Sequence, residues 1–291
     1  MPIFDFDDIH SAMSSLQIIP SYRSQEGGFQ IRRTFPSQGL DMLDPFLLLD
    51  YFGPMEVERG TKPGVSDHPH RGFETVTYIV EGEVEHNDSR GNHGVIKPGG
   101  IQWMTAGSGI IHSEFPSNEL SENGGRLKGF QLWVNLPKHK KMMETNYQDL
   151  TAKDLPLLEK DNYTLRVIGG TYDGITSPAT IQSSLLIAHL ALKEGVFEWD
   201  VTEGHNAALL VMDGQIEAMD TISGKTTTIL ESDLAVIGTN QIRIQTSKPA
   251  NIILLSGEPL NEPVARYGPF VMSTMGEIKQ ALLDYQSGIL K

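Results

Sequence analysis

Short β-branched apolar runs separated by turn residues are the feature that most constrains the fold of this chain. Examples are ETVTYIVEG, YTLRVIGG, QIRIQTS and NIILLSGEP, which are flanked by glycine, proline, asparagine or other turn-forming residues. Such turn signals recur about every 8–12 residues, a spacing typical of all-β sandwiches and barrels. The chain has 291 residues, enough for two domains of ordinary size. The sequence therefore predicts an all-β protein of two domains, each a β-sandwich or a β-barrel.

One segment near the C-terminus, TMGEIKQALLDYQSG, has the pattern of a helix. Thr274 is the expected N-cap, and Glu277 follows three residues later, which is the spacing of a capping box. Gly288 is placed to end the helix. One face of the helix is apolar and consists of Ile278, Ala281, Leu282 and Tyr285.

The polar segment 141–162 is the expected linker between the two domains. It predicts an N-terminal domain over residues 1–145 and a C-terminal domain over residues 146–291, the latter ending in the helix. FETVTYIVEGEVE near Phe73 and NAALLVMDGQIEA near Asn206 both contain an apolar run, an acidic–glycine turn and an alternating strand. Internal repetition of one sandwich would produce this similarity.

Composition excludes several classes of function. The chain has no cysteine, so it has no disulfide framework and no thiol nucleophile. Its formal net charge of −14 opposes direct binding to nucleic acid, and the one basic run, Lys138–Lys141, is expected to be a solvated loop. No run of 18 apolar residues predicts a transmembrane helix, and the start MPIFDFDDIHSAM lacks the features of a signal peptide. We expect a cytoplasmic protein without membrane or nucleic-acid partners.

Two histidine-containing pairs stand out in the first half. His68 and His70 are two residues apart, so on a strand both side chains point to the same face, where two imidazoles can reach one ion. Glu74 has the same parity and would share that face if the strand ran unbroken through Arg71 and Gly72.

The second pair is His112 and Glu114, in KPGGIQWMTAGSGIIHSEFP. These two residues again share a face if the segment is a strand. Imidazole and carboxylate together suit Fe, Mn, Ni, Cu or Zn. A hydrogen-bonded pair at a strand end is the alternative, and two such pairs in one predicted domain favour a metal site.

The strings HPHRGFETVTY and PGGIQWMTAGSGIIHSE resemble the pirin family, a branch of the cupin superfamily. The similarity covers nearly the whole chain, because it continues through LDPFLLLDYFGP (Leu43–Pro54), FQLWVNLP (Phe130–Pro137) and GEPLNEPVARYGPFVMSTMGEI (Gly257–Ile278). One departure is AGSGI, where family members usually read AGRGI; Ser108 replaces a long cation and puts in doubt any contact made by that arginine.

The resemblance implies a bicupin, with two β-barrels face to face and a C-terminal helix. It also implies one non-haem metal ion in the N-terminal barrel, with Fe(II) first and Mn, Ni, Cu, Co and Zn as alternatives. The implied ligands are His68, His70, His112 and Glu114. In most cupins the glutamate ligand follows the HxH pair closely, so Glu74 is the alternative that the family pattern disfavours. No metal is implied in the C-terminal barrel.

The function implied by the resemblance is that of a quercetin 2,3-dioxygenase, which opens a flavonol ring with O₂. The expected substrates are thus a small aromatic molecule and O₂, with Glu114 as ligand or general base. The alternative is a redox-sensitive iron protein that binds transcription factors or metabolic enzymes. A sugar-phosphate isomerase is disfavoured, because Arg71 is the only basic residue near the expected site. Candidates for the lining of the pocket are Phe73, Trp103, Met104 and Trp133.

Overall fold

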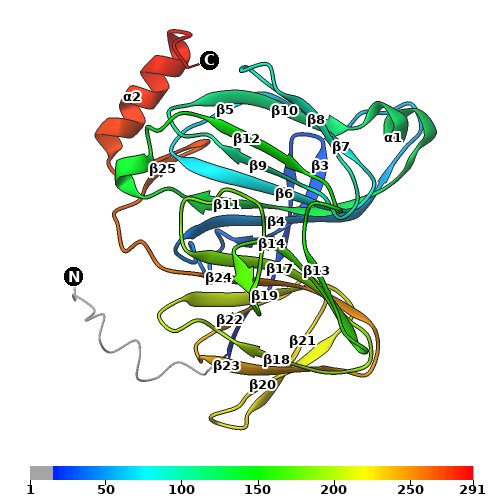
Figure 1. Ribbon diagram of the computed structural model, residues 1–291. Helices are drawn as coiled ribbons and strands as arrows, with labels where there is room; N and C mark the ends of the chain where they lie inside the picture. Colours follow the sequence, from blue (N-terminus) through cyan, green and yellow to red (C-terminus); the bar gives the residue numbers. More distant parts are fainter. Residues whose placement is uncertain (1–15, 291) are drawn as a thin grey trace.

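The computed structural model describes residues 16–290, which are built almost entirely of antiparallel strands (Figure 1). The first half forms a β-sandwich, here called the first sandwich. Its seven-stranded sheet has the order β12 (Asn146–Leu150), β9 (Ile101–Thr105), β6 (Phe73–Glu81), β11 (Gly125–Asn135), β4 (Phe46–Val57), β3 (Phe29–Phe35) and β2 (Tyr22–Glu26). Its four-stranded sheet has the order β5 (Val65–His70), β10 (Ile110–Pro116), β7 (Val84–Asp88) and β8 (His93–Ile96).

The second sandwich repeats this plan. Its seven-stranded sheet has the order β1 (Leu16–Ile19), β22 (Leu234–Ile237), β19 (Asn206–Asp213), β24 (Ala250–Gly257), β17 (Leu185–Leu192), β14 (Tyr163–Gly169) and β13 (Leu157–Glu159). Its four-stranded sheet has the order β18 (Gly195–Asp200), β23 (Gln241–Thr246), β20 (Ile216–Asp220) and β21 (Thr226–Ile229). A short hairpin joins β15 (Thr171–Tyr172) to β16 (Ile175–Thr176). The predicted repeat is confirmed, because β6 and β19 are both third in their seven-stranded sheets.

Each seven-stranded sheet takes its outer strand from the other half of the sequence. Strand β1 begins the described chain but pairs with β22 of the second sandwich, with Leu16 opposite Ile237. Strand β12 lies in the segment expected to be a linker, yet it pairs with β9 of the first sandwich. The division into residues 1–145 and 146–291 stays a prediction for folding units, but both of these strands cross it.

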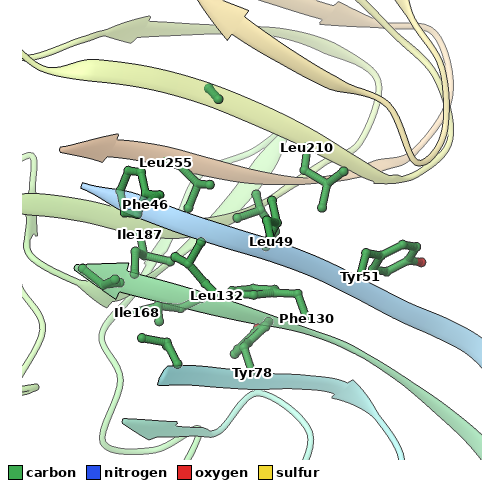
Figure 2. Close-up of a cluster of buried hydrophobic side chains, with 14 of the residues drawn as sticks. Phe46, Leu49, Tyr51, Tyr78, Phe130, Leu132, Ile168, Ile187, Leu210 and Leu255 are labelled. Atoms are coloured by element: carbon green, nitrogen blue, oxygen red, sulfur yellow. The ribbon is translucent and has the colours of Figure 1, made fainter. Parts of the chain in front are cut away.

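The two seven-stranded sheets pack face to face and form the largest core of the molecule (Figure 2). Phe130 and Leu132 on β11 point into this core and meet Ile187 and Leu255 of the second sandwich. Gln131 and Trp133, which alternate with them along β11, line a cavity inside the first sandwich. Both faces of the second half of β11 are therefore covered, and Phe130–Val134 are apolar apart from Gln131.

After β24 the chain returns to the first sandwich and covers its open side (Figure 1). This C-terminal segment contains β25 (Ala265–Tyr267), β26 (Phe270–Met272) and α2 (Met275–Gln286). The capping box of Thr274 and Glu277 is present, and Gly288 adopts the left-handed φ of 68° just past the helix end. The predicted helix is confirmed, with Ile278 and Ala281 buried and Leu282 partly buried, whereas Tyr285 of the predicted face is exposed.

The basic run Lys138–Lys141 is not the solvated loop that we expected. Lys138–Lys140 forms one 3-10 turn, η2, whereas the Lys141 side chain is buried. Its ammonium donates hydrogen bonds to the Gly72 carbonyl, the Asn135 amide oxygen and the Val271 carbonyl. This lysine is internal because the chain segments around Gly72, Asn135 and Val271 converge on it.

The fold prediction is confirmed: the described chain consists of two β-sandwich barrels, and its helices are α1 (Asn118–Asn123), η2 and α2. None of the helices in residues 16–290 has the length and apolar character needed to cross a membrane.

Tyr51 provides a test of the interface between the sandwiches. Its buried hydroxyl donates a hydrogen bond of 3.0 Å to the Met212 carbonyl of the second sandwich. We expect Tyr51→Phe to lower the free energy of unfolding by about 1–2 kcal/mol, because a buried carbonyl loses its donor. Tyr22→Phe is the matched control, since the Tyr22 hydroxyl also donates to a carbonyl but is exposed. Equal effects of the two variants in urea unfolding would contradict this view of the interface.

Candidate metal centre

Strand β10 organises the candidate site, because it runs between β5 and β7 in the four-stranded sheet. His112 lies opposite His68 of β5 on one side and opposite Asp88 of β7 on the other. Glu114 lies opposite His86. Residues two apart on a strand share a face, so three adjacent strands direct three pairs of polar side chains into the first sandwich.

His68, His70 and His112 form a cluster in which one ring nitrogen of each lies within 4.8 Å of the others. The Nδ1 of His68 is 2.9 Å from the Ser66 carbonyl, and the Nδ1 of His70 is 3.4 Å from the Pro269 carbonyl. A carbonyl only accepts, so each Nδ1 carries the hydrogen and each Nε2 keeps its lone pair. The Nε2 atoms of His70 and His112 are buried without a protein partner. This donor set fits a transition-metal ion.

Burial also sets the protonation state of the cluster. The pKa values of His70 and His112 are lowered well below the ordinary value, first by desolvation and then by the neighbouring imidazoles. Both rings are therefore neutral at pH 7, which is the form that binds a metal.

Glu114 is buried beside the cluster, but its carboxylate is held by protein donors. The Gln131 amide donates to both carboxylate oxygens at 3.0 and 2.9 Å, and the Thr77 hydroxyl lies 3.2 Å from Oε1. The compact cluster contains the three histidines without Glu114. Coordination by Glu114 thus stays a prediction, and its side chain lines the same cavity as His68 and His70.

Glu74, the alternative ligand, lies away from the histidines. Strand β5 ends at His70 and β6 begins at Phe73, with Gly72 between them at a φ of 90°. This break ends the unbroken alternation that would have placed Glu74 beside His70. The Glu74 side chain is fully buried, and its Oε1 accepts a hydrogen bond of 2.7 Å from Thr105. Burial raises the pKa of Glu74 to about 7.

A cavity of about 540 Å³ opens onto the cluster. Its apolar wall consists of Phe29, Ile31, Phe52, Val65 and Val84. Trp133 also lines the cavity, as predicted. Phe73 instead packs behind it, with its ring stacked on Trp133 at 4.3 Å and close to His70. Trp103 and Met104 lie in separate buried clusters, so the prediction is wrong for these two residues.

The cavity is also lined by charged side chains that were not predicted from the sequence. Arg33 forms a bidentate ion pair with Asp50, at 2.7 and 2.6 Å. The guanidinium of Arg266 lies 5.2 Å from the centre of the Trp133 ring. Arg71, the expected basic residue, instead binds the Ser108 carbonyl and Asp284 of α2. No local sequence pattern predicts that Arg33 and Arg266 line one cavity, because they come from opposite ends of the chain.

His86 and Asp88 are the clearest residues that sequence reasoning missed. His86 is fully buried, and its Nδ1 lies 3.2 Å from the Nδ1 of His112. Its Nε2 lies 3.4 Å from a carboxylate oxygen of Asp88. A signal was present: His86-Asn87-Asp88 has the same two-residue spacing as the HPH and HSE pairs.

The raised pKa of Glu74 leads to a pH-dependent prediction. A carboxyl whose pKa rises on folding favours the folded state while it is protonated. That contribution is lost as the pH rises from 4.5, its ordinary value, to about 7. Relative to Glu74→Gln, the wild type should lose roughly 3 kcal/mol over this range, at about 1.4 kcal/mol per pKa unit. Urea unfolding of both proteins at about pH 5 and pH 8 measures the difference; a constant difference would refute the assignment.

Known proteins are similar to this chain over most of its length. Residues 28–134 match the family model Pirin, and residues 187–291 match the Pirin C-terminal cupin domain. A pirin-like protein of Solanum lycopersicum is 39% identical, over 94% of this chain and 90% of the relative. The crystal structure of quercetin 2,3-dioxygenase from Acinetobacter baumannii is 38% identical, covers 94% of this chain and 96% of its own, and has a TM-score of 0.87. The fold is shared with a bacterial pirin from Escherichia coli in complex with nickel(II), at 20% identity, 84% and 99% coverage and a TM-score of 0.66. This chain belongs to the pirin family.

Proposed function

We propose that this protein is a metal-dependent dioxygenase that opens the ring of a flavonol such as quercetin with O₂. One observation carries the proposal: three clustered imidazoles, of which His70 and His112 are kept neutral by burial, place one ring nitrogen each within 4.8 Å of the others beside a largely apolar cavity. The similarity to quercetin 2,3-dioxygenase over most of the chain supports the same substrate class.

The residues of the cavity suit the binding of a flat aromatic molecule. Phe29 and Phe52 provide apolar surface on one wall, and Trp133 provides a ring on another. The Arg266 guanidinium stacks on Trp133 and holds the Leu47 carbonyl through a hydrogen bond of 3.0 Å. Arg266, which itself lines the cavity, thus helps to hold the tryptophan ring in position.

Deprotonation of the flavonol hydroxyl is the step that we assign to Glu114. Its carboxylate is buried and lines the cavity, and Gln131 and Thr77 hold it in place. A bound divalent ion supplies Lewis-acid stabilisation of the flavonol oxyanion and open positions of the kind that oxygenases need. We propose Fe(II) as that ion, held by the three histidines with Glu114 as a fourth ligand; Mn, Ni, Cu, Co and Zn are the alternatives.

Oxygen uptake tests the proposed function directly. Protein purified without oxygen is analysed for bound metal, then loaded in turn with Fe(II), Mn(II), Ni(II), Cu(II) or Co(II) and mixed with quercetin. The expected result is O₂ consumption with ring cleavage for at least one ion. No uptake with any ion or flavonol would refute the enzymatic function.

A regulatory function is the second candidate, because the metal site is connected to the surface helix α2. Pro269 accepts a hydrogen bond from His70, and Arg71 forms an ion pair of 2.7 Å with Asp284. A change in the oxidation state of a bound iron could reach the protein surface through these contacts. Partner capture that differs between Fe(II) and Fe(III) protein, without turnover, would favour this function.

The first variant for the proposed function is Glu114→Gln. If Glu114 is the base, this change should lower the rate about 10²–10⁴-fold while the protein keeps most of its metal. Steady-state oxygen uptake and metal analysis of the same sample measure the two effects. Glu56→Gln, at an exposed position, is the control. A Glu114→Gln protein with full rate would exclude the base role.

The second variant is His68→Ala, which removes one of the three clustered nitrogens. We expect metal retention to fall by at least tenfold, while the circular dichroism of the metal-free protein stays unchanged, because apolar cores maintain the fold. His139→Ala, at an exposed position on η2, should bind metal as the wild type does. Unchanged metal retention in His68→Ala would remove His68 from the ligand set.

A further inference from the structure

We propose that Asp88 and His86 form an outer pair that positions His112 as a metal ligand, through a continuous chain of hydrogen bonds from carboxylate to imidazole to imidazole. The inference rests on the metal centre of the proposed function, but it does not depend on the substrate or on catalysis. Neither residue belongs to the ligand cluster.

The register of the sheet places the outer pair on β7, directly beside β10. Asp88 lies opposite His112 across the strand pair, and His86 lies opposite Glu114. The Nδ1 atoms of His86 and His112 are 3.2 Å apart, and the Nε2 of His86 is 3.4 Å from Asp88. The side chains of His86 and Asp88 are completely buried, so bulk solvent does not reach these contacts.

The direction of each hydrogen bond follows from the carboxylate. The Asp88 oxygens accept hydrogen bonds from the backbone N–H groups of Arg90 and Asn92 and from the Asn92 amide. A carboxylate only accepts, so the Nε2 of His86 must carry the hydrogen that it donates. The Nδ1 of His86 is then an acceptor and takes the Nδ1 hydrogen of His112. His112 is left with its lone pair on Nε2, the buried nitrogen that has no protein partner.

The surroundings of His86 hold its ring in this position. The ring of Tyr147 on β12 covers one side, with 5.1 Å between ring centres and 33° between the planes. Gly94 lies opposite His86 on β8, and a Cβ there would be 2.2 Å from the Tyr147 hydroxyl. The glycine therefore leaves the space that the tyrosine needs to pack on His86.

The pair of His86 and Asp88 differs from an ordinary surface contact between histidine and carboxylate in the same sheet. His93 on β8 also binds a carboxylate, with its Nε2 2.9 Å from Glu85. That imidazole is exposed, with 56% of its side chain accessible, and reaches no other histidine. The pair of His86 and Asp88 is buried and ends on a proposed ligand, which is the arrangement by which outer carboxylates orient metal-bound imidazoles.

The outer pair is tested by binding of Co(II) to the full-length protein. Asp88→Asn keeps an acceptor oxygen for the turn but faces His86 with an amide N–H, which favours the opposite tautomer of both histidines. We expect a Co(II) dissociation constant about 10–100-fold weaker in Asp88→Asn and in His86→Gln, together with a shifted visible absorption band of the bound ion. His93→Gln is the matched control and should match the wild type in both measurements.

The outcomes separate this proposal from the proposed function. If both variants bind Co(II) with the affinity and the absorption band of the wild type, the outer pair has no positioning role. If Asp88→Asn fails to fold because its turn is lost, His86→Gln decides the question alone, since the turn contacts of Asp88 remain. A wild-type protein that binds Co(II) but consumes no O₂ refutes the dioxygenase and leaves this test intact.

Discussion

The antiparallel register of β10 with its two neighbours is the constraint on which the site depends. It brings together β5 and β7, which pair with β10 on opposite sides, with His112 opposite His68 on one and Asp88 on the other. A shift of one residue in either pairing would turn the side chains to the opposite face of the sheet. The site is therefore encoded in strand pairing more than in any single loop.

The rigid support for this register comes from burial on both sides of the first sandwich. One side is the core shared by the two seven-stranded sheets, and the other is the C-terminal segment. The C-terminal segment also supplies the Pro269 carbonyl that binds His70. The second sandwich thus contributes to the candidate metal centre indirectly, by supporting the large sheet of the first sandwich and by returning the chain to the site.

Much of this architecture could be predicted from sequence, because strand alternation and capping are local signals. The HPH and HSE pairs depend on a period of two, and the structure brings their three histidines together. The face on which Glu74 lies could not be predicted from its even spacing to His70, since the strand breaks at Gly72. The prediction for the basic run was wrong because Lys141 is buried by partners that lie far away in sequence, at Gly72 and Val271.

The exchange of outer strands between the two sandwiches has a consequence for the integrity of the molecule. No single cut of the chain separates the two sandwiches with all of their strands, because β1 precedes the strands of the first sandwich in sequence but belongs to the sheet of the second. A fragment that lacks β1 leaves one edge of β22 unpaired, and a fragment that lacks β12 leaves one edge of β9 unpaired. Bare strand edges of this kind recruit other chains into aggregates. Each half of the chain thereby covers a strand edge of the other half and protects it from aggregation.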